Sequence, residues 1–289
     1  MEGRRGRSVG QAVKGLLRLQ ILPGRPLAVR EVIMSQGKKQ GLRGISGNQL
    51  KVIAIIAMFM DHVGACILPK ALAAAKGEAG VWRNGGLASR FFSSAGFSVG
   101  ELENLYFVLR TIGRITFPIM AFLLVEGFFH TRNVKKYGAR LLCFAFLSEI
   151  PFDLVVSGRM FYWGHQNIFF TLFLCLMVLF AYETYRYQPF KQAAAAIGGA
   201  AAAVFLAVDY DFMAVLLVLV LYTYYGDRKG TVIYGGLICA AMSIGNYGAA
   251  ALAFLPIALY GGERGKWKMK YFFYCFYPLH LVIIYLAGM

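Results

Sequence analysis

Hydrophobic residues along this chain gather in long runs that are separated by short polar segments. The runs lie at about 50–68, 105–128, 141–156, 166–185, 193–208, 212–225, 231–246, 248–260 and 271–287. A straight helix that crosses a bilayer needs about 20 apolar residues, and several runs fall a little short of that length. The pattern predicts an all-α polytopic transmembrane bundle of about nine spans, within a range of roughly eight to ten. The stretch 231–260 forms either two short spans or one span and a re-entrant piece.

The composition also indicates a membrane protein. Of the 289 residues, 58% are hydrophobic and 15% are charged, and the mean hydropathy is +0.58. Little of the chain is left for a separate soluble domain, so the function must reside inside the bundle or at its mouths. The five cysteines stand singly in apolar runs, without a metal-ligand spacing or a disulfide framework,. We therefore expect small core residues at these positions and no metal site.

Positive charge predicts the orientation in the membrane. If the N-terminus is inside, the inner segments hold 23 of the 30 lysines and arginines, and the outer segments hold 5. Positively charged loops stay on the cytoplasmic side. The bias predicts a multi-pass protein of the cytoplasmic membrane with its N-terminus inside and, after nine spans, its C-terminus outside. It also explains the formal net charge of +16 through contact with the lipid bilayer, without a nucleic-acid partner,.

The chain divides into two parts at the start of the first apolar run. Residues 1–45 are basic, poor in acidic residues and without a sustained apolar run. They form either a disordered cytoplasmic tail, which we favour, or an amphipathic arm on the membrane surface. Residues 46–289 form the transmembrane domain.

Ionisable side chains inside the apolar runs mark the candidate site. The first run carries Asp61 and His62, and His62 lies about 20 Å along a helix from Gln49,. Such groups are costly at membrane depth and usually functional. The second run carries Arg110 and Arg114, which share a helix face,. With the predicted orientation these groups fall in one layer between the midplane and the outer surface, which predicts a shared cavity.

Each of these side chains has a functional role and a structural alternative. His62 is the candidate general base, and Asp61 either fixes its tautomer or forms an ion pair with an arginine of the second run. Arg114 lies deeper than Arg110 and is the candidate to stabilise an anion, whereas Arg110 either contributes to substrate binding or pairs structurally. His280, in the last run, either faces substrate or makes a hydrogen bond between helices.

Two further groups extend the candidate site. Glu149 and Asp153 flank Pro151, whose kink can aim both acids at a substrate or serve only a structural ion pair,. Gln166 and Asn167 face substrate or cap a helix. At the predicted inner mouth, a basic cluster either docks an anionic cytosolic cofactor or is simply solvated; its members are His130, Thr131, Lys135 and Arg140.

Several strings resemble the TraX family of membrane proteins. They are LKVIAIIAMFMDHVG, RTIGRITFPIMAFLLVEGFFHT, KYGARLLCFAFLSEIPFDL, QNIFFTL and YCFYPLHL. The resemblance covers roughly residues 45–289. The family is named for a conjugation protein that acetylates the N-terminal amine of pilin, and it looks related to integral-membrane acyltransferases. The resemblance implies acetyl-CoA as acyl donor and an amine or hydroxyl of an envelope or pilin component as acceptor.

We therefore expect an integral-membrane acyltransferase. Asp61, His62 and Arg114 would carry the chemistry, the basic inner mouth would receive acetyl-CoA, and the remaining polar residues would hold substrate. Two other functions remain open: a proton-coupled transporter, which would use the same acids, histidine and kinked helix, and a non-catalytic factor for pilus or envelope assembly.

Overall fold

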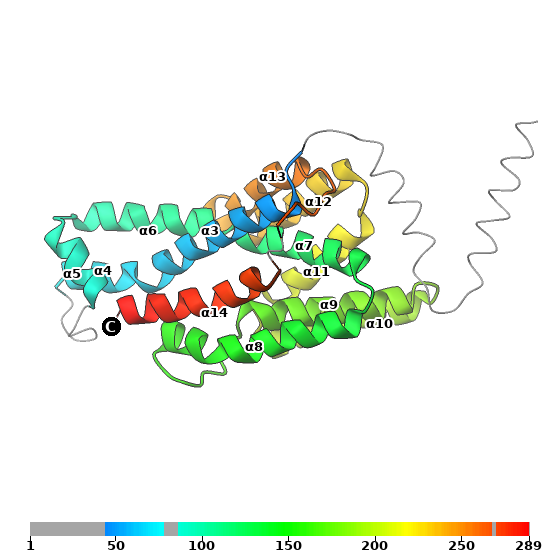
Figure 1. Ribbon diagram of the computed structural model, residues 1–289, viewed down its shortest axis with the longest axis horizontal. Coiled ribbons are helices and arrows are strands. Elements are labelled where there is room, and N and C mark those ends of the chain that lie inside the picture. Colours follow the sequence, from blue (N-terminus) through cyan, green and yellow to red (C-terminus); the bar gives the residue numbers. More distant parts are fainter. Residues whose placement is uncertain (1–43, 78–85, 268–269, 289) are drawn as a thin grey trace, which may run out of the picture. The chain divides into compact units, whose positions relative to one another are not determined.

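The computed structural model describes residues 44–77, 86–267 and 270–288 (Figure 1). The regular secondary structure of these residues is α-helical, with two short 3₁₀ turns, which confirms the all-α prediction. The tail predicted for 1–45 lies almost entirely outside the described residues. The helices are α3 (Gly47–Cys66), α4 (Leu68–Ala75), α5 (Leu87–Ser94), α6 (Val99–Gly113), α7 (Thr116–His130), α8 (Val134–Ser157), α9 (Ile168–Thr184), α10 (Pro189–Phe205), α11 (Asp211–Thr223), α12 (Arg228–Met242), α13 (Phe254–Ala258) and α14 (Lys270–Ala287).

The run predicted as one helix at 105–128 is divided between α6 and α7. Pro118 explains the break, because it has no N–H to bind the carbonyl of Arg114 four residues earlier. The backbone there forms a tighter turn, with hydrogen bonds to the residue three positions earlier. They run from Arg114 N to Thr111 O and from Ile115 N to Ile112 O, each 3.3 Å long. The break places Arg114 at the end of α6, directly before the first turn of α7.

The start of α3 is held in a defined register. Ser46 caps the helix and forms a capping box with Gln49,. The backbone N–H of Ile45 donates to the carbonyl of Leu259 over 2.8 Å, and that of Gly47 donates to the carbonyl of Glu263 over 2.8 Å. This attachment fixes how far along the bundle the later residues of α3 reach.

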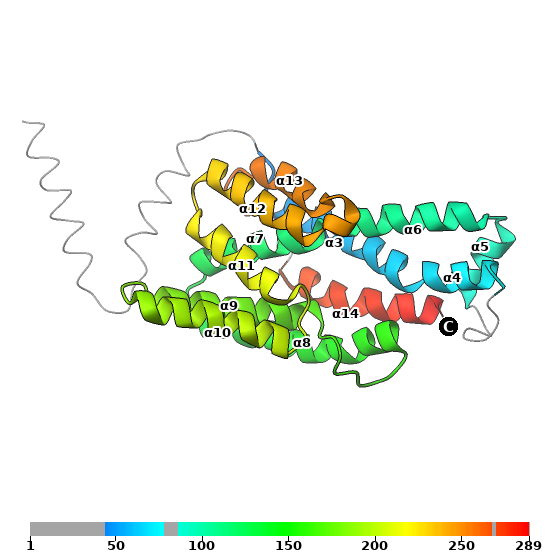
Figure 2. The ribbon, with the colours of Figure 1, turned by 180° about the vertical axis from the view of Figure 1, so that it is seen from behind.

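Helix α3 lies at the centre of the packing around the site. It packs against α6, α7 and α14, and α14 in turn packs against α8 (Figures 1 and 2). Gly64 allows the close crossing of α3 and α6, because a Cβ there would lie 3.0 Å from the Cβ of Leu109. Three helices that are separate from α3 in the sequence, α6, α7 and α14, thus pack around it.

Helix length and surface character indicate a membrane protein. Within the described residues, two helical stretches are long and apolar enough to cross a membrane, Gly47–Ala75 and Val99–His130, and several shorter helices are apolar. Large hydrophobic side chains are exposed on several helices, including Phe146, Leu237 and Ile283. Extended apolar surfaces are uncommon on soluble monomers. The number of spans and their orientation stay predictions.

Candidate functional site

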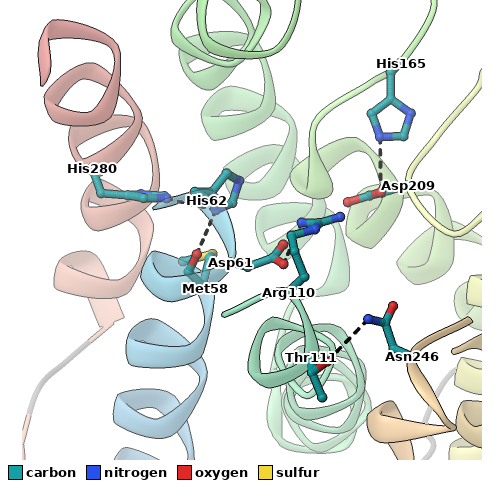
Figure 3. A network of polar contacts seen from close by, with 9 residues as sticks. All are labelled: Met58, Asp61, His62, Arg110, Thr111, His165, Asp209, Asn246 and His280. Atoms are coloured by element: carbon teal, nitrogen blue, oxygen red, sulfur yellow. Dashed lines mark hydrogen bonds and ion pairs between the residues drawn. The ribbon is translucent and has the colours of Figure 1, made fainter. Parts of the chain in front are cut away.

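Two histidines from opposite ends of the described chain meet at the centre of the site (Figure 3). His280 Nε2 on α14 lies 3.3 Å from His62 Nδ1 on α3, and the two rings are nearly perpendicular, at 75°. His62 Nδ1 also lies 2.8 Å from the carbonyl oxygen of Met58, one turn earlier on α3. His280 is buried, and its ring stacks on Phe276 with a centroid distance of 4.9 Å. His62 is half-buried, so its ring also reaches open space.

Asp61 leaves α3 in a different direction and contacts α6 instead. Its Oδ1 accepts a hydrogen bond of 2.6 Å from Arg110 (Figure 3). Gly113 allows this approach, since a Cβ at that position would overlap the Asp61 carboxylate. The carboxylate of Asp61 thus binds Arg110 and not His62, because adjacent helix residues point about 100° apart, and a role of Asp61 in orienting His62 stays a prediction,. The alternative of an ion pair between Asp61 and an arginine of the second run is confirmed for Arg110.

A cavity of about 50 Å³ opens beside His62. This volume is enough for a few water molecules or a group as small as an acetyl. Residues from α3, α6, α7, α9, α14 and the turn before α11 line it: Met58, Asp61, His62, Gly113, Thr116, Phe117, Met120, Ile168, Asp209, Tyr210 and Tyr277. The shared cavity predicted for the ionisable layer is present, although only Asp61 and His62 of the predicted site residues line it.

Thr116 is a polar residue of this cavity that sequence reasoning did not select. It is 8% exposed, and its hydroxyl has no hydrogen-bond partner among the described residues. A buried hydroxyl without a partner is unfavourable, so a ligand or water in the cavity would satisfy it. The sequence did contain a pointer to Thr116: it stands two residues before Pro118, and proline is common in the first turn of a helix,.

Arg114 sits at the break between α6 and α7 and does not line the cavity. Its Nε is buried without a hydrogen-bond partner among the described residues. The predicted pairing with an acid is thus formed by Arg110 and not by Arg114. Arg114 remains the arginine with unused hydrogen-bonding capacity next to the site.

His165 and Asp209 form a second contact at the predicted outer surface. His165 Nε2 lies 3.2 Å from Asp209 Oδ1, and both side chains are partly exposed (Figure 3). The hydrogen bond to Asp209 raises the pKa of His165, although burial acts in the opposite direction. Next to this pair, Gln166 N donates to the carbonyl of Ala207 over 3.0 Å. Because Asp209 also lines the cavity, the pair links a partly exposed part of the surface to the site.

The acids around Pro151 belong to a separate cluster between α8 and α9. Asn167 is fully buried and donates to Glu149 and, over 2.8 Å, to the carbonyl of Ala145. Its side-chain oxygen also caps α9 by accepting from Phe169 N. Asp153 is 1% exposed and accepts from Tyr162 N over 2.8 Å. Neither Glu149, Asp153 nor Asn167 lines the cavity, so a role for them in substrate binding stays a prediction.

The predicted inner mouth lies where α7 ends and α8 begins. His130 Nδ1 lies 2.8 Å from the carbonyl oxygen of Glu126, and Thr131 caps the end of α7. Lys135 is exposed, and the guanidinium of Arg140 lies 5.4 Å from the centre of the Tyr137 ring. His130 follows Met120 of the cavity wall by about 15 Å along α7. The basic cluster and the cavity are therefore two distinct places.

Comparison with known proteins supports one family. The family described as TraX protein matches residues 46–287. A protein of Dichelobacter nodosus described as a probable fimbrial assembly protein, FimC, is 32% identical over 268 residues, which cover 84% of this chain and 96% of that protein. No solved structure matches the chain significantly. The family match extends over nearly all of the predicted transmembrane domain, including the helices that carry His62 and His280, and on this ground the chain belongs to the TraX protein family.

Proposed function

We propose that this protein is an integral-membrane acyltransferase with a role in pilus or envelope assembly. The observation that carries the proposal is the position of His62. Its Nδ1 contacts Met58 O and His280 Nε2, its Nε2 has no hydrogen bond among the described residues, and its ring lines a small cavity. A neutral imidazole with one available nitrogen suits general base catalysis.

The proposed reaction transfers an acetyl group from a thioester to an amine or hydroxyl. The acceptor's lone pair forms a bond to the acyl carbon, and its proton passes to His62 Nε2. The carbon–sulfur bond then breaks, its electron pair leaves on the CoA sulfur, and His62 returns the proton to that thiolate or to water. The Thr116 hydroxyl and the guanidinium of Arg114 are the nearby donors that could stabilise the negative charge on the acyl oxygen,.

The acyl donor in this proposal is acetyl-CoA. Lys135 and Arg140 supply positive charge for its phosphates at the start of α8, with His130 and Thr131 beside them. The cavity is too small for a whole CoA molecule, so only the acetyl end would enter it. The arm that carries the thioester would then have to span the distance of about 15 Å along α7.

The membrane arrangement that fits this scheme has nine spans, the N-terminus inside and the C-terminus outside. It rests on the charge bias of the loops. A reporter fused after Met289 should then be accessible from outside the cell, and one inserted in 129–140 should be accessible only from the cytoplasm. A cytoplasmic C-terminus would show that the stretch 231–260 contributes a different number of spans.

The acceptor is proposed from the relative's description. That protein is described as a fimbrial assembly protein, and an amine or hydroxyl of a pilin or envelope component is the matching acceptor class. Purified protein in detergent or nanodiscs, given acetyl-CoA labelled in the acetyl group and a pilin or envelope fraction, should transfer label to the acceptor. Equal labelling with heat-inactivated protein would contradict the proposal.

A non-catalytic assembly factor is the second candidate. The relative's description favours it, because it speaks of assembly and of no transfer reaction. In that case His62→Gln would leave pilus or envelope assembly intact while the protein remains in the membrane. Under our proposal the same variant would block assembly although its amount and fold are unchanged.

A further inference from the structure

The two meeting histidines share one local arrangement. His62 Nδ1 lies 2.8 Å from the carbonyl oxygen of Met58, and His280 Nδ1 lies 2.9 Å from the carbonyl oxygen of Phe276. In both cases the carbonyl belongs to the residue four positions earlier in the same helix. A carbonyl oxygen only accepts hydrogen bonds, so each Nδ1 must carry the hydrogen. An unprotonated Nδ1 at that distance would place two lone pairs against each other.

The contact between the rings agrees with this assignment. In neutral imidazole only one nitrogen carries a hydrogen. Since His280 carries it on Nδ1, its Nε2 is an acceptor, and this atom lies 3.3 Å from His62 Nδ1. The hydrogen on His62 Nδ1 is thus shared between Met58 O and His280 Nε2. The opposite direction of donation would leave both carbonyls facing unprotonated nitrogens.

His280 stands behind His62 as seen from the cavity. His62 lines the cavity and His280 does not, and His280 is 1% exposed. Phe276 stacks on the His280 ring with an interplanar angle of 7°, and Tyr277 contacts it from another side. The ring is held in place by these contacts, and its Nε2 is aimed at His62 (Figure 3).

We propose that His280 is the positioning residue of the site, which accepts the Nδ1–H of His62 and so leaves His62 Nε2 as the basic atom on the cavity. The inference rests on the proposed function and gives His280 the place that a carboxylate holds in a catalytic triad. When His62 Nε2 takes the acceptor's proton, His280 Nε2 stabilises the positive charge through the strengthened Nδ1–H hydrogen bond. Asp61 is not available for this role because it binds Arg110.

The tautomers can be measured without any acyl transfer. Nitrogen NMR of protein labelled with ¹⁵N-histidine separates protonated from unprotonated ring nitrogens, and the variants His62→Gln and His280→Gln assign the two signals. We expect a protonated Nδ1 and an unprotonated Nε2 on both residues. His130, which has the same Nδ1 contact to Glu126 O but no histidine partner among the described residues, is an internal reference. A protonated Nε2 on either His62 or His280 would overturn the proposal.

Activity variants test whether the contact serves the reaction. His280→Phe keeps a flat ring against Phe276 but has no acceptor, whereas His280→Gln places an amide oxygen close to the position of Nε2. We expect His280→Phe to lower kcat by about 10–100-fold with little change in KM, as is typical for residues that orient a catalytic group. His280→Gln should recover most of that loss. A packing role would give the reverse order, with His280→Phe the more active variant.

Two controls keep the outcome readable. Leu279→Ala, next to His280 but 59% exposed, should leave activity unchanged.

If His280→Phe does not fold, His280→Asn replaces it, because the shorter Asn side chain does not reach His62. Equal activity of the Asn and Gln variants would contradict the proposal. If wild-type protein transfers no acetyl group, the proposed function fails, while the NMR result still decides the tautomer assignment.

Discussion

The two neighbours Asp61 and His62 lie on the same turn of α3 and make contrasting contacts. On the α6 side, Asp61 and Arg110 form a charged pair at 2.6 Å, and Gly113 gives the carboxylate room. On the α14 side, two imidazole rings meet at 3.3 Å. In the first contact, the opposite charges of Asp61 and Arg110 neutralise each other. In the second, His62 contacts His280 through Nδ1, so its other ring nitrogen, Nε2, is left for the cavity. The charged pair therefore joins α3 to α6, whereas the His62 ring beside it is the group that we propose for the chemistry.

The largest effect should come from His62. His62→Ala removes the proposed base, and loss of a general base typically costs about 10²–10⁴ in rate. The variant should remain folded, because His62 is half-buried and its loss removes only ring contacts to Tyr277 and His280. Initial rates of acetyl transfer and a thermal unfolding curve measure the two outcomes.

The matched control for this experiment is Ile56→Ala, which changes an exposed side chain of the same helix. It should retain the wild-type rate. Full activity in His62→Ala would contradict the proposal that His62 is the general base. The non-catalytic assembly function would then be preferred.

The charged side of α3 should affect stability more than chemistry. Removing one member of a buried ion pair lowers the free energy of unfolding by about 3–5 kcal/mol. The pair of Asp61 and Arg110 is only half-buried, so the loss should be somewhat smaller than that. Asp61→Asn and Arg110→Met should each lower the unfolding temperature. The double variant should lose less than the two single losses added together, because the members share one interaction.

The rates of the same variants sharpen the comparison. If Asp61 only joins helices, Asp61→Asn protein that remains folded should keep a far larger share of its acetyl transfer rate than His62→Ala. Equal loss of rate in both variants, with folding intact, would return Asp61 to the catalytic group that the sequence suggested.

A smaller effect is expected at Gly113. A Cβ there overlaps the Asp61 carboxylate, whereas a Cβ at Gly100, on the same helix, has nothing within 4 Å. Gly113→Ala should destabilise the protein by about 1–3 kcal/mol, in the range of overpacked positions. Gly100→Ala should be neutral or stabilising by about 0.4–1 kcal/mol, because it reduces the freedom of the unfolded chain.

Chemical denaturation of the two glycine variants in the same detergent gives the comparison directly. Equal stabilities would show that α3 and α6 do not need the close approach seen at Gly113, and the ion pair would then be more loosely held than the structure indicates.

The smallest effect concerns the outer pair of His165 and Asp209. Asp209 raises the pKa of His165 in the folded protein above its usual value of about 6.5,. The stabilising contribution is therefore complete below about pH 6.5 and is lost as the pH rises through the higher folded pKa. Because both side chains are partly exposed, the contribution should stay below about 1 kcal/mol,.

The unfolding temperature should accordingly fall slightly between about pH 6 and 8 in the wild type, where histidines titrate. Asp209→Asn should remove most of that slope. A slope that is unchanged in Asp209→Asn would assign the pH dependence to another group.

The sequence alone determined the all-α class of the molecule and singled out the first residues of its candidate site. Nine apolar runs predicted helices, and each run coincides with one helix, a broken pair of helices or a short helical segment. Asp61, His62 and the arginines of the second run were found because ionisable groups are rare in apolar helices. Their common layer stays a prediction that rests on the alternating direction of successive runs, and the structure has a cavity beside Asp61 and His62.

Only the tertiary structure decided which of these groups meet. His62 and His280 are 218 positions apart, and no periodicity within one helix predicts which faces of two distant helices pack together. Sequence adjacency suggested that Asp61 serves His62, but helix geometry turns the two side chains about 100° apart. Thr116, Tyr210 and Tyr277 entered the site for the same reason, because a cavity wall is assembled from several elements that packing brings together.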